Sequence, residues 1–411
     1  MTRTRLTLNE YRTAESVPLT DAQVRSLRSL EPNPVQVMPH PSDPSLYDLT
    51  ATSLVGLINV EDLDLEIRPK LAIDRLLFLL SYSMDPAHWR SLHAEFEERD
   101  SLFDAIVPGF VFQVRQALKR GLLQGYRVQE DADITVRGRI RVSEQIRRHY
   151  GIALPIELRY DELTEDILEN QLLKAAIHRL WKLRIRSSWI RQALREFDLV
   201  LQNVSLVEFP RHSIPEVRFT RLNQRYRPAV QLARLILRAT SFDLCTGAVG
   251  ASEFLVNMNQ VFEEFVEAAL GESIARCGLR LRPQDDRLRL DLDRRIRLVP
   301  DISVWQGGRC LLIGDVKYKR TGDNRGSNPD IYQLLAYTIA ADLPGGVLIY
   351  AKGEDEPRVH ITRIVEKQLR VVALDLELSP EGILEQIDSL AADLLHGVEQ
   401  PTGAAPHRLP F

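Results

Sequence analysis

Two aspartates and one lysine in the C-terminal third of the chain have the spacing of a site that hydrolyses phosphodiesters. Asp301 follows Pro300 at the start of one apolar segment, and Asp315 and Lys317 end the next apolar segment. Carboxylates are hard oxygen ligands of the kind that Mg²⁺ takes, together with water and phosphate. Such a metal lowers the pKa of a bound water, and a nearby lysine can orient that water, help to deprotonate it or stabilise the charged phosphate. We therefore predict that Asp301, Asp315 and Lys317 are catalytic.

A structural alternative uses two of the same residues. Asp315 and Lys317 could form an ion pair at a strand end, which is worth about 0–1 kcal/mol if exposed. We favour the catalytic interpretation because two flanking segments, both predicted as helices, carry further polar residues. Glu263 lies in the first, and Gln333 and Tyr337 share one face of the second at positions i and i+4.

The two aspartates must be brought together by a β-hairpin, with strands over 299–305 and 311–317. A three-residue loop at 306–308 would place Asp301 opposite Ile313 and diagonal to Asp315, with their Cβ atoms roughly 6–8 Å apart. A two-residue loop of Gly307 and Gly308 would instead put the two carboxylates on opposite faces, unless a β-bulge, for example at Gly314, restored the register.

The remaining pattern predicts an α+β protein of several domains. Alternation over 62–68 predicts a half-buried strand, helices follow from residue 73 to about 122, and residues 134–142 read as another strand. Thr164 is the expected N-cap of a long helix. Further helices are predicted over 190–201, 230–237, 258–270 and 330–340. We assign a β-rich domain with a helical insertion to 1–160, a helical region to 161–250, an α/β domain with a mixed central sheet flanked by helices to 251–400, and a loose tail to 401–411.

Composition excludes several classes of protein. The net charge of −4 rules out a uniformly basic coat for nucleic acid, although a local basic patch remains possible. No apolar run approaches the roughly 20 residues of a membrane helix, and no secretory signal is evident, so a cytoplasmic location is expected. The three cysteines lack the spacing of a disulfide framework or a zinc site. No phosphate-binding loop of the form G-x-x-x-x-G-K-[ST] occurs, so we expect the chain to bind no nucleotide.

Motifs along most of the chain resemble those of the McrC family. These proteins are the nuclease subunits of McrBC-type, methylcytosine-dependent restriction systems, and they carry a restriction-endonuclease-like domain of the PD-(D/E)xK superfamily. The matching residues are Ile67-Arg68-Pro69-Lys70, Ile73-Asp74-Arg75-Leu76-Leu77, Val136-Arg137-Gly138-Arg139-Ile140, Thr164-Glu165-Asp166, Glu169-Asn170, Asn259, Phe262-Glu263, Pro300-Asp301, Asp315-Val316-Lys317-Tyr318-Lys319, Gln333 and Tyr337.

For the site, the resemblance implies metal-dependent cleavage of double-stranded DNA by the three predicted catalytic residues. Mg²⁺, or Mn²⁺ in its place, would be held by Asp301, Asp315, Val316 and Glu263. Glu263, Gln333 and Tyr337 would support the metal or the phosphate, by likeness to RecB-like nucleases.

For partners, the resemblance implies a hexameric AAA+ GTPase that recognises modified DNA, methylated at cytosine, and translocates it. The N-terminal β-rich domain would dock on that ring and stimulate its GTPase.

Two other functions remain open from the sequence. The chain could be a stand-alone PD-(D/E)xK repair or defence nuclease that cuts with Mg²⁺ and no nucleotide. It could also be a non-catalytic adaptor that activates a ring NTPase. The arginine-rich segment 280–297 could lead DNA to the site, or it could be a solvated strand face that pairs with its own aspartates.

Overall fold

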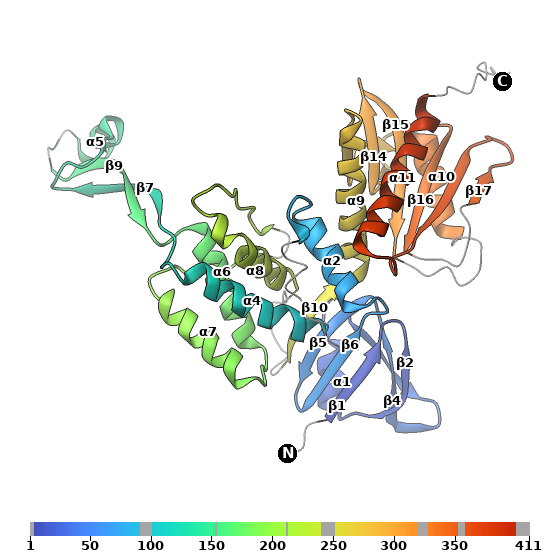
Figure 1. Cartoon of the computed structure of the whole chain (residues 1–411), viewed down its shortest axis with the longest axis horizontal. Helices are drawn as coiled ribbons and strands as arrows, with labels where there is room; N and C mark the ends of the chain where they lie inside the picture. Colours follow the sequence, from blue (N-terminus) through green and yellow to red (C-terminus); the bar gives the residue numbers. More distant parts are fainter. Residues whose placement is uncertain are drawn as a thin grey trace.

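The computed structural model describes residues 4–90, 101–150, 152, 154–210, 213–239, 251–318, 328–351 and 358–399. They form an N-terminal body of two sheets, a helical body that carries a long arm, and a C-terminal body around one mixed sheet (Figure 1). The prediction of a mixed α and β protein with several sheets is confirmed. No helix within these ranges has both the length and the apolar character needed to cross a membrane.

The N-terminal body consists of a four-stranded sheet in the order β1-β6-β5-β10 and a three-stranded sheet in the order β2-β4-β3. Helix α1 packs against strands β3 and β5 of these sheets. The elements are β1 (Thr4–Asn9), β2 (Thr13–Pro18), α1 (Asp21–Arg28), β3 (Val35–His40), β4 (Asp43–Ala51), β5 (Leu54–Val60), β6 (Leu63–Arg68) and β10 (Ala251–Asn257).

Strand β6 confirms the strand predicted over 62–68, but its polar side does not face solvent. Asp64 and Glu66 are both buried. Asp64 pairs with Arg186 of the helical body, and Glu66 pairs with Arg5 at 2.7 Å. The prediction of a half-buried strand is therefore wrong for this face. Alternation fixes which residues share a side, while the elements that cover each side come from elsewhere in the chain.

Strand β10 joins the N-terminal sheet from far along the sequence. It runs antiparallel to β5, from Ala251 opposite Val60 to Asn257 opposite Leu54. Gly56 has a φ of +139°, and a Cβ there would lie 1.9 Å from the carbonyl oxygen of Phe254, so this pairing requires glycine. The range predicted for the nuclease domain, 251–400, thus begins on a strand of the N-terminal sheet.

The helices expected as one insertion into the β-rich domain are divided between two bodies. Helix α2 packs on α9 of the C-terminal body, where the Phe78 and Phe265 rings meet edge to face at 5.4 Å. Helix α4 packs on α7 and α8 of the helical body instead. Residues 91–100, also predicted as helical, lie outside the described part. The elements are α2 (Ile73–Met84), α4 (Leu102–Leu118), α6 (Leu168–Lys182), α7 (Ser188–Val200), the 3-10 turn η2 (Gln224–Tyr226) and α8 (Arg227–Ala239).

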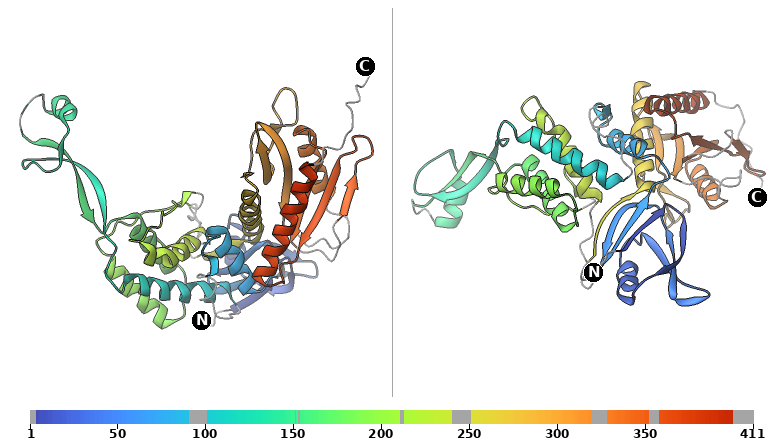
Figure 2. Two further views of the ribbon diagram at one scale, coloured as in Figure 1. Left: turned by 45° about the horizontal axis from the view of Figure 1, so that its top comes forward. Right: turned by 60° about the horizontal axis from the view of Figure 1, so that its bottom comes forward.

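A long arm, built on the three-stranded sheet β7-β9-β8, projects from the helical body (Figure 2). Its elements are β7 (Gly125–Asp133), β8 (Arg139–Ile140), α5 (Val142–His149) and β9 (Ile156–Thr164). The strand predicted over 134–142 is wrong except at β8, because the chain turns at Gly138 with φ +73° and enters helix α5. Thr164 is not the predicted N-cap. It ends β9, and α6 begins at Leu168.

The C-terminal body has a six-stranded sheet in the order β11-β14-β15-β16-β18-β17. The β15–β16 and β16–β18 pairs are parallel and the other pairs are antiparallel, as in the predicted mixed sheet. Helices α9 and α11 pack against each other and the sheet, and α10 packs on β15 and β16. The elements are α9 (Met258–Arg276), β11 (Leu281–Pro283), β12 (Leu288–Arg289), β13 (Arg297–Leu298), β14 (Ile302–Gln306), β15 (Arg309–Lys317), α10 (Asn328–Ala340), β16 (Gly345–Ala351), β17 (Arg358–Ile361), β18 (Gln368–Leu374) and α11 (Pro380–Glu399).

Candidate active site

The hairpin of β14 and β15 brings the two aspartates to the same place. Gly307 and Gly308 form a two-residue turn with φ values of +55° and +84°, and Gln306 pairs with Arg309. The register predicted from a three-residue loop is therefore wrong. A bulge between Val304 and Trp305 shifts the pairing, so that Ile302 lies opposite Gly314. Asp301 then comes beside Asp315. A bulge restores the register, as the second alternative required, but it lies nearer the turn than Gly314.

Asp301, Asp315 and Lys317 form one compact cluster. The Lys317 Nζ atom lies 2.6 Å from Asp315 Oδ2 and 3.7 Å from Asp301 Oδ2. Asp301 Oδ2 also accepts a hydrogen bond from the backbone N–H of Val316 at 2.9 Å. The Asp315 side chain is only 1% exposed and that of Lys317 is 22% exposed. The ion pair of the structural alternative is thus present, but it is buried and shares its lysine with a second carboxylate.

The cluster carries more negative than positive charge. Burial and the neighbouring Asp301 raise the pKa of Asp315 to about 7. Burial and the charge of Asp301 also raise the pKa values of Glu263 and Glu267, on helix α9, to about 7 each. Burial alone would lower the pKa of Lys317, but attraction to Asp315 outweighs it and the pKa is raised. One ammonium group therefore faces four carboxyl groups.

This charge distribution fits a divalent cation. Opposite charge near a buried carboxylate favours its ionised form, so a cation would relieve the repulsion that raises these pKa values. Within the described ranges, no group of three or more His, Cys, Asp or Glu side chains is placed so that it could hold a metal ion. Mg²⁺ does not need such a group, because it usually binds one or two carboxylates and keeps several waters. Asp301 and Asp315 are the carboxylates that could hold it. Val316 and Glu263, the further ligands implied by the resemblance to McrC, stay predictions.

Gln333 and Tyr337 face each other on α10, as their spacing predicts. Gln333 Nε2 donates to Tyr337 Oη at 2.7 Å, and Tyr337 Oη donates to the carbonyl oxygen of Val299 at 3.1 Å. Tyr337 is buried against Cys310 and Ile313, and burial raises its pKa to about 12. The tyrosine therefore fixes the backbone that leads into Asp301.

A family model described as "McrBC 5-methylcytosine restriction system component" matches residues 49–351, well over half of the chain. This chain belongs to the McrBC family. The resemblance to McrC read from the motifs is thereby confirmed at the level of the family.

Two known proteins are similar to this member of the McrBC family. One is the Escherichia coli (strain K12) protein named "Type IV methyl-directed restriction enzyme EcoKMcrBC", which is 20% identical over 80% of this chain and 97% of its own length. The other is a chain in a structure of Thermococcus gammatolerans McrB AAA+ hexamers with bound McrC. The match is 18% identical in sequence and covers 94% of this chain and 100% of that chain. Its TM-score of 0.56 shows a shared fold.

Two further residues at the candidate site were not predicted from the sequence. Gln284 Nε2 donates to Asp301 Oδ1 at 2.9 Å, and Glu267 is close enough to Asp301 for their charges to interact. Glu267 stands four residues after Glu263 on one helix, so helical spacing could have indicated it. Gln284 has no such signal, since it meets Asp301 only through the pairing of β11 with β14.

The arginine-rich segment 280–297 is partly self-paired. Arg287 contacts Asp285 at 2.6 Å and lies over the Trp305 ring at 4.1 Å. Arg297 contacts Asp286 at 3.2 Å. These contacts agree with the solvated, self-paired alternative, and a role in leading DNA to the site stays a prediction.

Proposed function

We propose that this chain is the DNA endonuclease subunit of a restriction system directed at 5-methylcytosine. The observation that carries the proposal is the buried cluster of Asp301, Asp315 and Lys317, whose excess negative charge suits a divalent metal. The PD-(D/E)xK nuclease fold of the C-terminal body is part of the same proposal. Because the substrate is DNA, the proposal places the chain in the cytoplasm.

Mg²⁺, or Mn²⁺ in its place, bound at Asp301, Asp315, Val316 and Glu263 would supply Lewis-acid stabilisation of the phosphate and a more acidic water. The protein supplies the rest. The Val316 N–H and Gln284 hold the two oxygens of Asp301. The raised pKa of Lys317 favours the ammonium form, which can orient the attacking water and offset negative charge on the phosphate. Gln333 and Tyr337 support this arrangement through Val299.

The similar chain from Thermococcus gammatolerans is bound to McrB AAA+ hexamers. We propose an AAA+ GTPase hexamer as the partner of this chain also, docked through the predicted range 1–160. Within that range the arm offers the clearest surface, because its apolar side chains are exposed rather than packed. They include Tyr126, Ile134, Val136, Val142, Ile146 and Tyr150. The partner would recognise the modified base and translocate double-stranded DNA.

The test is a cleavage assay on the chain purified with its AAA+ partner. Methylated and unmethylated plasmids are incubated with Mg²⁺, with and without GTP. We expect GTP-dependent cutting of methylated DNA, and its loss in Lys317→Ala with GTPase stimulation kept. Lys182→Ala, an exposed lysine on α6, is the matched control and should cut normally.

The alternatives give different results in the same assay. Cutting by the chain alone, without GTP, would identify a stand-alone nuclease. No cutting in the presence of normal GTPase stimulation would identify an adaptor.

A further inference from the structure

Tyr318, the residue after Lys317, lies where three parts of the molecule meet. It directly follows strand β15, its ring lies 6.0 Å from the Phe262 ring of helix α9, and its hydroxyl donates to Glu10 Oε2 at 3.3 Å. Phe262 directly precedes Glu263. Tyr318 therefore touches the strand that carries Lys317, the helix that carries Glu263, and the N-terminal body.

Glu10 is held firmly in the N-terminal body. It follows strand β1 and is fully buried. Its backbone N–H donates to the carbonyl of Arg68 at 2.9 Å, and its Oε2 accepts from the backbone N–H of Lys70 at 3.2 Å. The carboxylate that receives the Tyr318 hydroxyl is thus fixed to the end of strand β6.

The opposite side of the candidate active site is anchored to the same sheet. Strand β10 pairs with β5 and runs directly into helix α9. At the junction, Met258 N donates to Ser53 O at 2.9 Å and Asn259 Nδ2 donates to Ser53 Oγ at 3.2 Å. The N-terminal sheet therefore holds both the helix of Glu263 and, through Glu10, the strand of Lys317.

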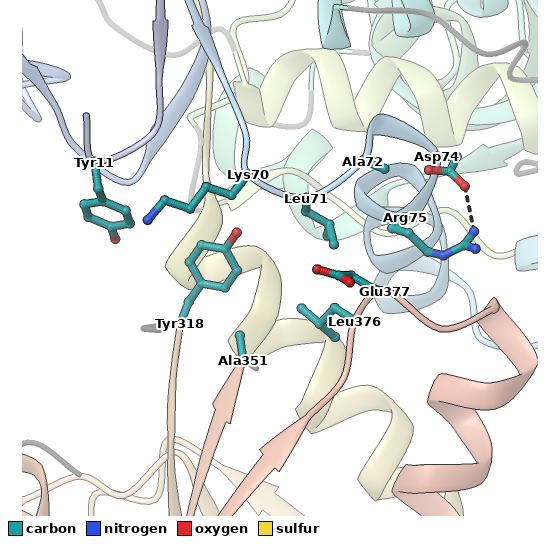
Figure 3. Close-up of a pocket in the computed structure, with 10 residues that line it drawn as sticks. All are labelled: Tyr11, Lys70, Leu71, Ala72, Asp74, Arg75, Tyr318, Ala351, Leu376 and Glu377. Atoms are coloured by element: carbon teal, nitrogen blue, oxygen red, sulfur yellow. Dashed lines mark hydrogen bonds and ion pairs between the residues drawn. The ribbon is translucent and has the colours of Figure 1, made fainter. Parts of the chain in front are cut away.

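The side of this junction that faces the N-terminal body is not filled by packed side chains. A pocket of about 190 Å³ lies there, at the ends of the parallel strands β15 and β16. Tyr318 and Ala351 line it from the C-terminal body, and Tyr11, Lys70 and Leu71 line it from the N-terminal body (Figure 3). Because close packing is incomplete on this side, the polar contact with Glu10 contributes to the placement of Tyr318.

We propose that Glu10 and Tyr318 are positioning residues through which the N-terminal sheet sets the placement of Lys317 relative to Glu263 and Asp301. Their effect is on the rate of the chemical step, since small displacements of catalytic groups reduce rates steeply. The proposal rests on the nuclease function proposed above. It gives the N-terminal body a role in catalysis in addition to docking.

The experiment measures single-site cleavage kinetics of the complex with the AAA+ partner, at saturating GTP and Mg²⁺. Tyr318→Phe removes the hydroxyl and keeps the ring. We expect kcat to fall about tenfold with KM unchanged, a fold-change within the range for the loss of one buried hydrogen bond. The kcat of Glu10→Ala should fall by the same factor. Glu10→Gln keeps an acceptor oxygen and should restore most of the rate.

Two further variants separate positioning from general damage. The double variant of Glu10→Ala with Tyr318→Phe should be no slower than either single variant, because both substitutions remove the same contact. Tyr226→Phe is the matched control. It removes another buried tyrosine hydroxyl, which accepts from Leu123 N at 2.9 Å in the helical body, and should leave kcat unchanged.

Several results would overturn the proposal. These are an unchanged kcat in Tyr318→Phe, a Glu10→Gln variant as slow as Glu10→Ala, additive losses in the double variant, or an equal loss of GTPase stimulation, which would mean a defect of assembly. Lys317→Ala distinguishes a failure of the proposed nuclease function from a failure of the positioning proposal. If it still cuts, the nuclease function itself is wrong. If it is inactive while Tyr318→Phe is normal, only the positioning proposal fails.

Discussion

Replacing Asp315 by asparagine should stabilise the metal-free protein while removing the proposed nuclease activity. The Asp315 carboxyl is buried, and its pKa is raised from 3.8 to about 7. At about 1.4 kcal/mol per pKa unit, ionising this group at neutral pH lowers the free energy of unfolding by about 4 kcal/mol. Asparagine has nearly the same shape and no charge. Asp315→Asn should therefore recover up to about that amount, or about 8–16 °C in the melting temperature of a domain of this size.

The sign of the pH dependence follows from the raised pKa. Between about pH 4 and pH 7 the folded protein binds a proton at Asp315 that the unfolded chain has released, so the wild-type stability falls as pH rises through this range. The difference between variant and wild type should be absent near pH 3, grow up to about pH 7, and stay constant above it. Thermal melts in EDTA from pH 3 to pH 8 measure it.

Mg²⁺ and one other aspartate supply the controls. Added Mg²⁺ should raise the melting temperature of the wild type and have little effect on Asp315→Asn, because binding to the folded state alone is stabilising. In EDTA at neutral pH, Asp285→Asn should be less stable than the wild type. The Arg287 guanidinium holds the pKa of Asp285 far below its usual range, so that charge stabilises the fold at neutral pH and stops doing so in acid. Two results would contradict a raised pKa of Asp315. One is an Asp315→Asn variant that is no more stable than the wild type at pH 8, and the other is a variant that exceeds the wild type by the same amount at pH 3 as at pH 8.

Three further variants test the fold and the arm. Gly56→Ala should destabilise the chain by several kcal/mol in denaturant melts, since its Cβ would overlap the Phe254 carbonyl and the β5–β10 pairing would open. Tyr337→Phe should cost about 1 kcal/mol of unfolding free energy and slow cleavage, because the carbonyl of Val299 loses its donor; an unchanged rate would contradict the supporting role. Ile146→Ser should leave the melting temperature unchanged, since the side chain is exposed, but weaken stimulation of the proposed partner's GTPase in a titration; full stimulation would argue against docking through the arm.

Tertiary pairing explains where the sequence-based predictions went wrong. The alternation of β6 identified a strand, but Asp64 and Glu66 are covered by arginines that no local pattern could assign to them. Residues 134–142 alternate like a strand, yet the chain turns at Gly138, where a Cβ would lie 2.4 Å from the carbonyl of Arg159 on β9. Strand β10 could not be placed from its own residues, since its partner β5 lies far earlier in the chain.

Residue type and local spacing are enough to indicate the candidate catalytic residues and the elements that carry them. Asp301, Asp315 and Lys317 were identified from residue type and spacing, and the strands and helices around them follow from hydrophobic periodicity, which is a local property. The family also followed from short local motifs.

The way those residues meet depends on how distant segments pack against one another. The bulge near Trp305 puts both carboxylates on one face, and a shift of one residue would have separated them. Burial then raises the pKa of Asp315, Gln284 reaches Asp301 from a separate strand, and Glu10 reaches Tyr318 from the N-terminal body. Register, desolvation and long-range contacts depend on how segments pack together, and no single segment encodes them.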